Sequence, residues 1–198
     1  MIRVVVIEDQ ALVRNAIVAL LNLDPFIEVV GEASDGQSAL TLLTEVRADL
    51  LLSDIEMPNM SGLELAEQVT HEGLQIVIMT TFSKSGYIRR ALDAGVRGFI
   101  LKEASSDYLI DALKKVHQGQ KVIDPELALL ALEDNNPLSR KESAALKLTE
   151  EGLKTSDIAA QLYLSEGTVR NYLSEAISKL NASNRSDAAR IARQKGWL

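Results

Sequence analysis

Residues 50–58 have the sequence Leu-Leu-Leu-Ser-Asp-Ile-Glu-Met-Pro, in which a short apolar run leads into one aspartate, Asp54. An apolar run of this length is typical of a strand that is buried on both faces of a parallel sheet. Asp54 then lies at the carboxyl end of the strand, the edge at which open α/β sheets carry their sites. An aspartate that only begins the next loop would give the same local pattern, so the rest of the chain has to decide.

Three further apolar runs share this pattern, residues 27–33 alternate apolar and polar residues as in a more exposed strand, and a helical pattern follows each of the five. Strands are expected at residues 4–7, 27–33, 50–53, 75–79 and 98–101. Helices are expected at residues 12–23, 35–43, 63–69, 87–94 and 106–118. Strands that alternate with helices indicate a parallel sheet covered on both faces. The predicted fold is therefore an α/β doubly wound five-stranded parallel sheet.

Polar side chains follow four of these strands at the point where each strand ends. They are Glu8 and Asp9, Asp54, Thr80, and Lys102. Because the carboxyl ends of parallel strands share one edge, we expect three carboxylates, a hydroxyl and an ammonium group in one crevice. Mg²⁺ relieves the repulsion of such carboxylates, and an aspartate can attack phosphorus. The cation, the lysine and the hydroxyl would then stabilise the phosphoryl oxygens. Loop carboxylates that merely pair with Lys102 are the alternative, which matched polar groups on four strand ends disfavour.

Residues 1–118 resemble the receiver domain of bacterial two-component response regulators. The motifs that carry the resemblance are Glu8-Asp9, Asp54 in the Asp-Ile-Glu-Met-Pro context, Thr80-Thr81, and Phe99 three residues before Lys102. The resemblance implies that Asp54 accepts a phosphoryl group and that Lys102 binds it. It also implies a Mg²⁺ site formed by Glu8, Asp9, Asp54 and the Glu56 carbonyl, with Thr80 and Phe99 as the switch residues. Phe99 equally fits an ordinary core aromatic residue. Glu103 stands where many receivers have proline, which concerns only the adjoining loop.

Composition excludes several classes of site. The 198 residues, 46% hydrophobic and 25% charged, suit two small globular domains. The absence of cysteine excludes disulfides, thiolate zinc sites and a Cys nucleophile, and two distant histidines, His71 and His117, disfavour a His-based site. No apolar run approaches a membrane span, and acidic residues follow the N-terminus too closely for a signal peptide. We expect a cytoplasmic protein without a membrane partner.

Charge is distributed unevenly along the chain. Residues 1–136 carry 11 Lys/Arg and 21 Asp/Glu, whereas residues 137–198 carry 10 Lys/Arg and 7 Asp/Glu. The corresponding net charges are −10 and +3. An acidic body with a basic tail predicts that only the tail meets nucleic acid.

The tail itself has a helical pattern. Residues 119–136 are expected to be a linker with one short helix, ended by Asn135-Asn136-Pro137. A packed connector that has no signalling role explains the residues of the linker at least as well. Helices follow at residues 140–151, 155–162, 165–180 and 185–195. The second and third, joined by a tight turn, form a helix-turn-helix pattern.

The third of these helices is the expected DNA-reading element. Its apolar positions leave Arg170, Asn171 and Ser174 on the opposite face. Arginine suits guanine or phosphate, asparagine suits adenine, and serine is permissive. A helical bundle used for protein docking is the alternative, which the basic charge disfavours.

Residues 137–198 resemble the LuxR/FixJ-type DNA-binding domain. The matching motifs include Leu138-Ser139, Ile158-Ala159, Thr168-Val169-Arg170-Asn171-Tyr172 and Lys179-Leu180. The resemblance implies that Arg170, Asn171 and Ser174 face bases and that Thr168 and Lys179 hold phosphates. Ser174 stands where a basic residue is frequent, so the base preference does not carry over.

Together the two resemblances imply a response regulator of the NarL/FixJ class and no enzyme. A sensor histidine kinase would phosphorylate Asp54, and the first and fifth receiver helices would pair two copies as a homodimer. The expected target is double-stranded promoter DNA, with RNA polymerase as a further candidate partner. Two rivals stay open: a haloacid-dehalogenase-like phosphatase with Glu56 as its second acid, and a DNA-binding or docking module that ignores phosphorylation.

Overall fold

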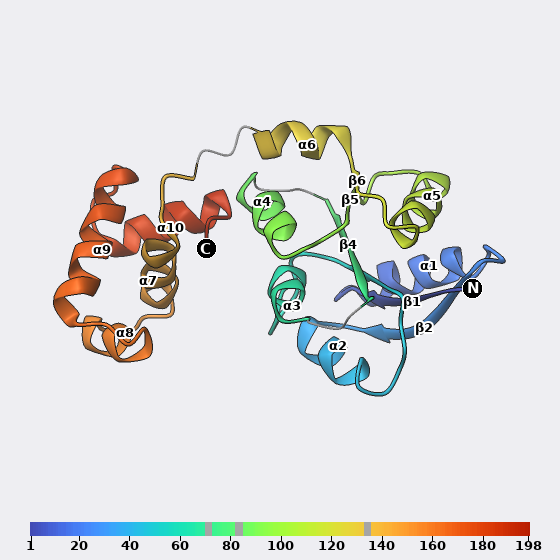
Figure 1. Ribbon diagram of the computed structural model, residues 1–198, viewed down its shortest axis with the longest axis horizontal. Helices are drawn as coiled ribbons and strands as arrows, with labels where there is room; N and C mark the ends of the chain where they lie inside the picture. The colour runs from blue at the N-terminus through green and yellow to red at the C-terminus, as the bar shows by residue number, and fades with distance from the viewer. Residues whose placement is uncertain (70–72, 82–84, 133–135) are drawn as a thin grey trace. The chain divides into compact units, whose positions relative to one another are not determined.

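The chain forms two compact units in a computed structural model that describes residues 1–69, 73–81, 85–132 and 136–198. One unit is an α/β sheet domain and the other consists of helices (Figure 1). His71 and Asn135, which figure in the sequence predictions, lie outside the described residues.

The sheet of the first unit is parallel throughout. Its strands are β1 (Ile2–Ile7), β2 (Ile27–Ala33), β3 (Leu50–Ser53), β4 (Gln75–Thr80), β5 (Gly98–Leu101) and β6 (Val122–Ile123). They lie in the order β2-β1-β3-β4-β5-β6, with every neighbouring pair parallel. Leu50, Leu51 and Leu52 are at most 1% exposed, as expected for a strand covered on both faces. The predicted doubly wound parallel sheet is confirmed.

The sixth strand lies in the segment that the sequence assigned to a linker. Val122 and Ile123 pair with Gly98 and Phe99 at the edge of the sheet. The short strand satisfies backbone groups of β5 that would otherwise face water at an open edge. The helix α6 (Pro125–Leu132) follows directly, and it matches the short helix predicted for the linker.

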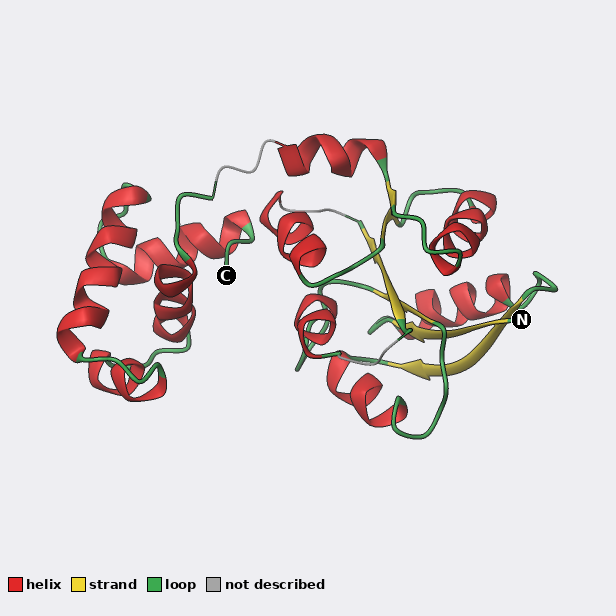
Figure 2. Cartoon of the chain, viewed as in Figure 1, coloured by secondary structure: helices red, strands yellow, loops and turns green. Residues whose placement is uncertain are grey.

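Five helices cover the two faces of the sheet (Figures 1 and 2). They are α1 (Ala11–Leu21), α2 (Gly36–Leu42), α3 (Gly62–Gln68), α4 (Ser85–Asp93) and α5 (Ser106–His117). Apolar side chains of α1 and α5 pack on one face of the sheet, and α2, α3 and α4 lie on the other. Asp35, Ser61 and Ser105 cap α2, α3 and α5, because each side chain accepts a hydrogen bond from a backbone N–H of the first turn.

The second unit has four helices and its own core. They are α7 (Arg140–Glu150), α8 (Thr155–Gln161), α9 (Glu166–Lys179) and α10 (Arg185–Lys195). Its core is made of small and branched apolar residues, among them Leu146, Ile158, Val169 and Leu173. The predicted helix-turn-helix is confirmed as α8 and α9, with Ser165 as the N-cap of α9. Across the described residues, no helix is both long and apolar enough to cross a membrane.

Candidate functional site

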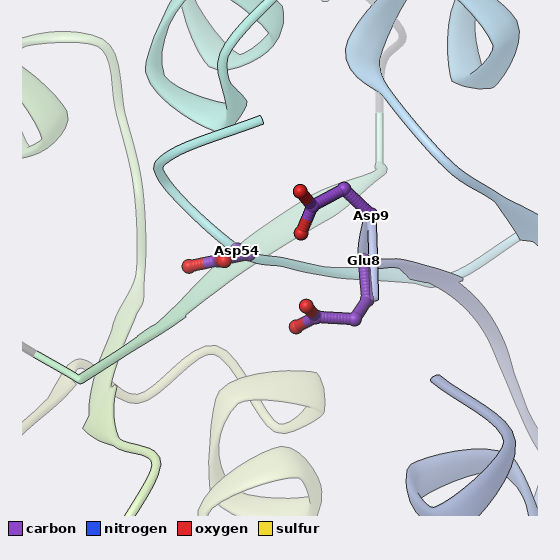
Figure 3. Close-up of side chains that lie close together, drawn as sticks. All are labelled: Glu8, Asp9 and Asp54. Atoms are coloured by element: carbon purple, nitrogen blue, oxygen red, sulfur yellow. The ribbon is translucent and has the colours of Figure 1, made fainter. Parts of the chain in front are cut away.

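Three carboxylates meet at the carboxyl edge of the sheet (Figure 3). Glu8 and Asp9 follow β1, and Asp54 follows the adjacent strand β3. The backbone N–H of Asp54 donates to the Ile7 carbonyl at 2.9 Å, which keeps the two strand ends side by side. One carboxylate oxygen from each of the three residues lies within 4.8 Å of the others. The three carboxylates therefore converge as the strand ends predict.

Lys102 supplies the cation of this cluster. Its Nζ lies 2.7 Å from Glu8 Oε2 and 2.8 Å from Asp54 Oδ2. The Lys102 backbone N–H donates to the Thr80 carbonyl at 2.8 Å, so the end of β4 fixes the start of the lysine loop. Side-chain exposure is only 1% for Glu8, 10% for Asp54 and 13% for Lys102. The ammonium group thus offsets one of the two negative charges on carboxylates that have little access to water.

Burial shifts the pKa values of Glu8 and Lys102 in this cluster. Loss of hydration raises the pKa of Glu8 above its usual value, although its contacts with Lys102 oppose that shift. Burial also disfavours the charged form of Lys102, but hydrogen bonds with Asp54 and Glu8 outweigh it and raise the pKa of the ammonium group. Lys102 therefore stays charged at neutral pH, and its ammonium group lowers the pKa of Glu8 that burial raises.

The donor set fits a magnesium ion. Mg²⁺ prefers oxygen ligands, and protein carboxylates usually supply one or two of its six positions while water supplies others. Glu8, Asp9 and Asp54 offer three such oxygens, and Asp9 is exposed, which leaves room for water. Glu56 is exposed and its carboxylate is outside this cluster; its predicted role concerns the backbone carbonyl.

The loop that carries Asp54 is held by a glycine that the sequence analysis did not single out. Gly62 donates its N–H to the Ile55 carbonyl at 3.0 Å. A Cβ atom at position 62 would lie 1.9 Å from the Asp54 carbonyl oxygen and 2.6 Å from Ser53 Oγ. Only glycine allows α3 to begin this close to the strand end. The Ser61-Gly62 pair at the start of the helix was a possible signal, but the close approach depends on tertiary structure.

A second contact fixes the far end of the same loop. Asn59 has a left-handed backbone, with φ of 61°, and its Nδ2 donates to Asp35 Oδ2 at 2.9 Å. The Gly36 N–H donates to the Met60 carbonyl at 3.0 Å. The first turn of α2 therefore anchors the loop between Asp54 and α3.

The two predicted switch residues lie on neighbouring strands. Thr80 ends β4 and is 3% exposed. Phe99 lies in β5, is fully buried and pairs with Ile78 in the register of the sheet. A fully buried ring satisfies the core interpretation, and a switch would require the ring to repack.

In the second unit, α9 presents the three predicted base-facing residues to solvent. Arg170, Asn171 and Ser174 are exposed, whereas Val169 and Leu173 are buried. The side chain of Thr168, half-buried, is hydrogen-bonded through Oγ1 to Ser165 Oγ at 2.8 Å. The predicted division of α9 into an apolar and an exposed face is thus present in the structure.

Arg170 pairs with the exposed Glu166 of its own helix at 3.7 Å, whereas Lys179 is bound more closely, by a buried carboxylate of another helix. The Lys179 Nζ lies 2.8 Å from both Oε1 and Oε2 of Glu142. Glu142 is 1% exposed and forms a capping box with Ser139 at the start of α7. Sequence reasoning gave Glu142 no role, since the 37 positions that separate it from Lys179 leave no local pattern.

Comparison with known protein families assigns both units. Residues 4–114 match the family described as the response regulator receiver domain. Residues 136–192 match bacterial regulatory proteins of the luxR family. The two matches cover most of the chain.

Relatives align with this chain over its whole length. The chain is 44% identical to the uncharacterized transcriptional regulatory protein YvfU of Bacillus subtilis (strain 168) and 40% identical to the transcriptional regulatory protein DesR of the same organism. Both alignments cover 100% of this chain and 100% of the relative. The solved structure of a two-component response regulator RcsB–DNA complex is similar with a TM-score of 0.68 and 26% identity, over 100% of this chain and 99% of that chain.

Proposed function

Because the chain belongs to the response regulators that join a receiver domain to a LuxR-type DNA-binding domain, we propose that it regulates transcription in response to phosphorylation of Asp54. The observation that carries the proposal is the cluster of Glu8, Asp9 and Lys102 around the Asp54 carboxylate. A nucleophile for phosphorus needs cationic partners that can take up the charge of the phosphoryl oxygens, and this cluster has both a lysine and a metal-binding donor set.

The donor of the phosphoryl group is a sensor histidine kinase. A carboxylate oxygen of Asp54 attacks phosphorus, the nitrogen–phosphorus bond of the phosphohistidine breaks, and the imidazole leaves as it gains a proton. Glu8, Asp9, Asp54 and the Glu56 carbonyl would hold Mg²⁺, which would supply charge neutralisation for the transferred group. Lys102 already lies 2.8 Å from Asp54 Oδ2, so its ammonium needs only a small movement to reach a phosphoryl oxygen on that carboxylate.

The new phosphoryl group carries about −1.5 to −2 charges and three acceptor oxygens. Thr80 turns its hydroxyl toward these oxygens, and Phe99 repacks into the space that the threonine leaves. Phosphorylation thus shifts the population from the packing without this contact to the packing in which Thr80 contacts the phosphoryl group, which a small free-energy difference between the two packings allows.

The output of the shift is a homodimer on DNA. The surface beside α1 and α5 supports pairing through these helices: Leu12 is 84% exposed, Phe26 is 64% exposed, and the Lys114 ammonium lies 5.2 Å from the centre of the Phe26 ring. The helix α10 pairs the DNA-binding domains. A two-fold dimer reads paired half-sites in a promoter.

Within each half-site, Arg170, Asn171 and Ser174 face bases, and Thr168 contacts a phosphate. The proposed receiver spans residues 1–118, the linker 119–136 contributes β6 to the receiver's sheet, and the DNA-binding domain spans 137–198. The protein acts in the cytoplasm on double-stranded promoter DNA, with RNA polymerase as a further partner.

A phosphotransfer assay tests the proposal. The full-length chain is incubated with a radiolabelled small phosphoryl donor, with Mg²⁺ or with a chelator, and the protein-bound label is counted. We expect acid-stable, base-labile label on the wild type only with Mg²⁺, and none on Asp54→Asn. Equal labelling of both proteins would place the phosphoryl group elsewhere and refute the proposal.

A further inference from the structure

The ion pair between Lys179 and Glu142 joins two helices of the DNA-binding unit. Lys179 is the last residue of α9, and Glu142 is the third residue of α7. The Lys179 ammonium lies 2.8 Å from each oxygen of the Glu142 carboxylate. The same carboxylate accepts the Ser139 N–H at 2.7 Å through Oε2, so it is held on both sides.

Glu142 cannot easily lose this partner. Its side chain is 2% exposed, whereas that of Lys179 is 39% exposed. Burial alone would raise the pKa of Glu142, but Lys179 and the Ser139 N–H more than offset it and keep the pKa below its usual value. A lysine that moved away to bind DNA would leave a buried carboxylate without its counter-charge, which is strongly unfavourable.

The pair also lies at the end of α9 opposite to the exposed polar residues. Arg170 and Asn171 lie near the N-terminal end of the helix, the end that enters the major groove in helix-turn-helix proteins. Lys179 follows Arg170 by nine residues, roughly 14 Å along the helix axis at 1.5 Å per residue. An anchor at this distance controls the angle at which the N-terminal half of α9 meets the groove.

We infer that Lys179 is a positioning residue, which fixes the recognition helix α9 on α7 through Glu142, and that it is not a DNA phosphate ligand. This inference depends on one part of the proposed function, namely that α9 binds DNA. It replaces the phosphate role that the sequence resemblance implies for Lys179.

The two roles predict opposite effects of a change at Glu142. Glu142→Gln keeps an acceptor for the Ser139 N–H but removes the negative charge that holds Lys179. A phosphate-binding lysine would then be freed, and DNA binding would tighten. A positioning lysine would lose its anchor, and DNA binding would weaken.

The experiment measures DNA binding by the full-length chain, activated with Mg²⁺ and beryllium trifluoride as a phosphoryl mimic, as a function of salt. The variants are Lys179→Gln, Glu142→Gln and the double variant, with Arg170→Gln as the control for loss of a charge that faces DNA. The probe is a duplex selected from a random pool by the wild-type protein, titrated between about 50 and 300 mM KCl. The slope of log affinity against log salt counts phosphate contacts, at about 0.9 per contact. Thermal unfolding monitored by circular dichroism establishes that each variant is folded at the assay temperature.

We expect Lys179→Gln and Glu142→Gln each to weaken DNA binding at least about twofold. About twofold is the lower limit of the coupling that is usual between two residues in contact. The salt slopes of both variants should equal that of the wild type, and the double variant should bind no worse than the weaker single variant. A slope lowered by about 0.9 in Lys179→Gln, or tighter binding by Glu142→Gln, would overturn the inference. Failure of the wild type to select any duplex would instead contradict the proposed DNA-binding function.

Discussion

Replacing Lys102 with methionine removes the cation between Glu8 and Asp54 while keeping most of the side-chain volume. The two carboxylates have oxygens within 4.8 Å of each other and side-chain exposures of 1% and 10%. At that separation their mutual repulsion is about 3 kcal/mol for an effective dielectric constant of about 20. Loss of one partner from a buried ion pair costs about 3–5 kcal/mol. We expect the receiver domain to lose about 3 kcal/mol of unfolding free energy in the absence of divalent cations.

Two features distinguish this loss from ordinary destabilisation. The pKa of Glu8 is already raised by burial, so the folded variant binds a proton more readily than the unfolded chain does. Its stability therefore falls as pH rises through the usual carboxylate range toward the raised pKa of Glu8, and the defect is largest at alkaline pH. Magnesium should also stabilise the variant more than the wild type, because no ammonium group competes with the ion in the variant. Free Mg²⁺ tenfold above the dissociation constant of the variant would stabilise it by about 1.4 kcal/mol.

The assay is calorimetric unfolding of the full-length chain with chelator and with Mg²⁺, in which the receiver transition is followed. Lys115→Met is the matched control, because Lys115 pairs with Asp111 on the surface of α5, where both side chains are about half exposed. We expect the control to change stability by less than about 0.5 kcal/mol. The reasoning is refuted if Lys102→Met unfolds like the control, or if Mg²⁺ stabilises the wild type as much as the variant.

Three further outcomes follow from the geometry. Gly62→Ala should destabilise the receiver by about 3 kcal/mol, since the new Cβ would lie 1.9 Å from the Asp54 carbonyl oxygen. Gly167→Ala should be tolerated, because the nearest atom to its Cβ is 3.7 Å away. Chemical denaturation measures the stability of both variants. Ser165→Ala should lower the unfolding free energy of the DNA-binding unit by about 1 kcal/mol, because the Ser165 hydroxyl caps α9 by accepting a hydrogen bond from the Thr168 N–H. An unchanged melting temperature would contradict this prediction. Wild type and Glu142→Gln should converge in stability as pH falls. Because the pKa of Glu142 is lowered in the folded state, its carboxylate stabilises the fold fully above the unfolded pKa of about 4.3. This stabilisation is lost as pH falls through the folded pKa. Acid titration of unfolding tests it, and a constant difference down to about pH 2 would exclude the ion pair as the cause.

The sequence predicts those parts of the fold that depend on local pattern. The apolar run before Asp54 is a fully buried strand, and the other strand ends bring Glu8, Asp9 and Lys102 to the same edge. The faces of α9 follow from helical periodicity alone, since residues three and four apart share a side. These features need no knowledge of which elements touch.

Features that depend on contacts between distant residues could not be predicted in this way. The demand for glycine at position 62 comes from the Asp54 carbonyl, which approaches only after the sheet and α3 have packed. Glu142 lies at the start of one helix and Lys179 at the end of another, so nothing local indicates that they meet. The strand β6 has two residues, too few for a periodic pattern, and its partner is the edge of a sheet already formed.

The central claim, that the state of Asp54 controls DNA binding, is tested most directly by sedimentation and DNA binding in the presence of Mg²⁺ and beryllium trifluoride, a phosphoryl mimic. The comparison is between the wild type and Asp54→Ala, each with and without the mimic. The account predicts that the mimic converts only the wild type to a dimer and tightens only its binding to a promoter duplex. Equal DNA binding by both proteins, unchanged by the mimic, would contradict it and would leave the helix-turn-helix under some other control.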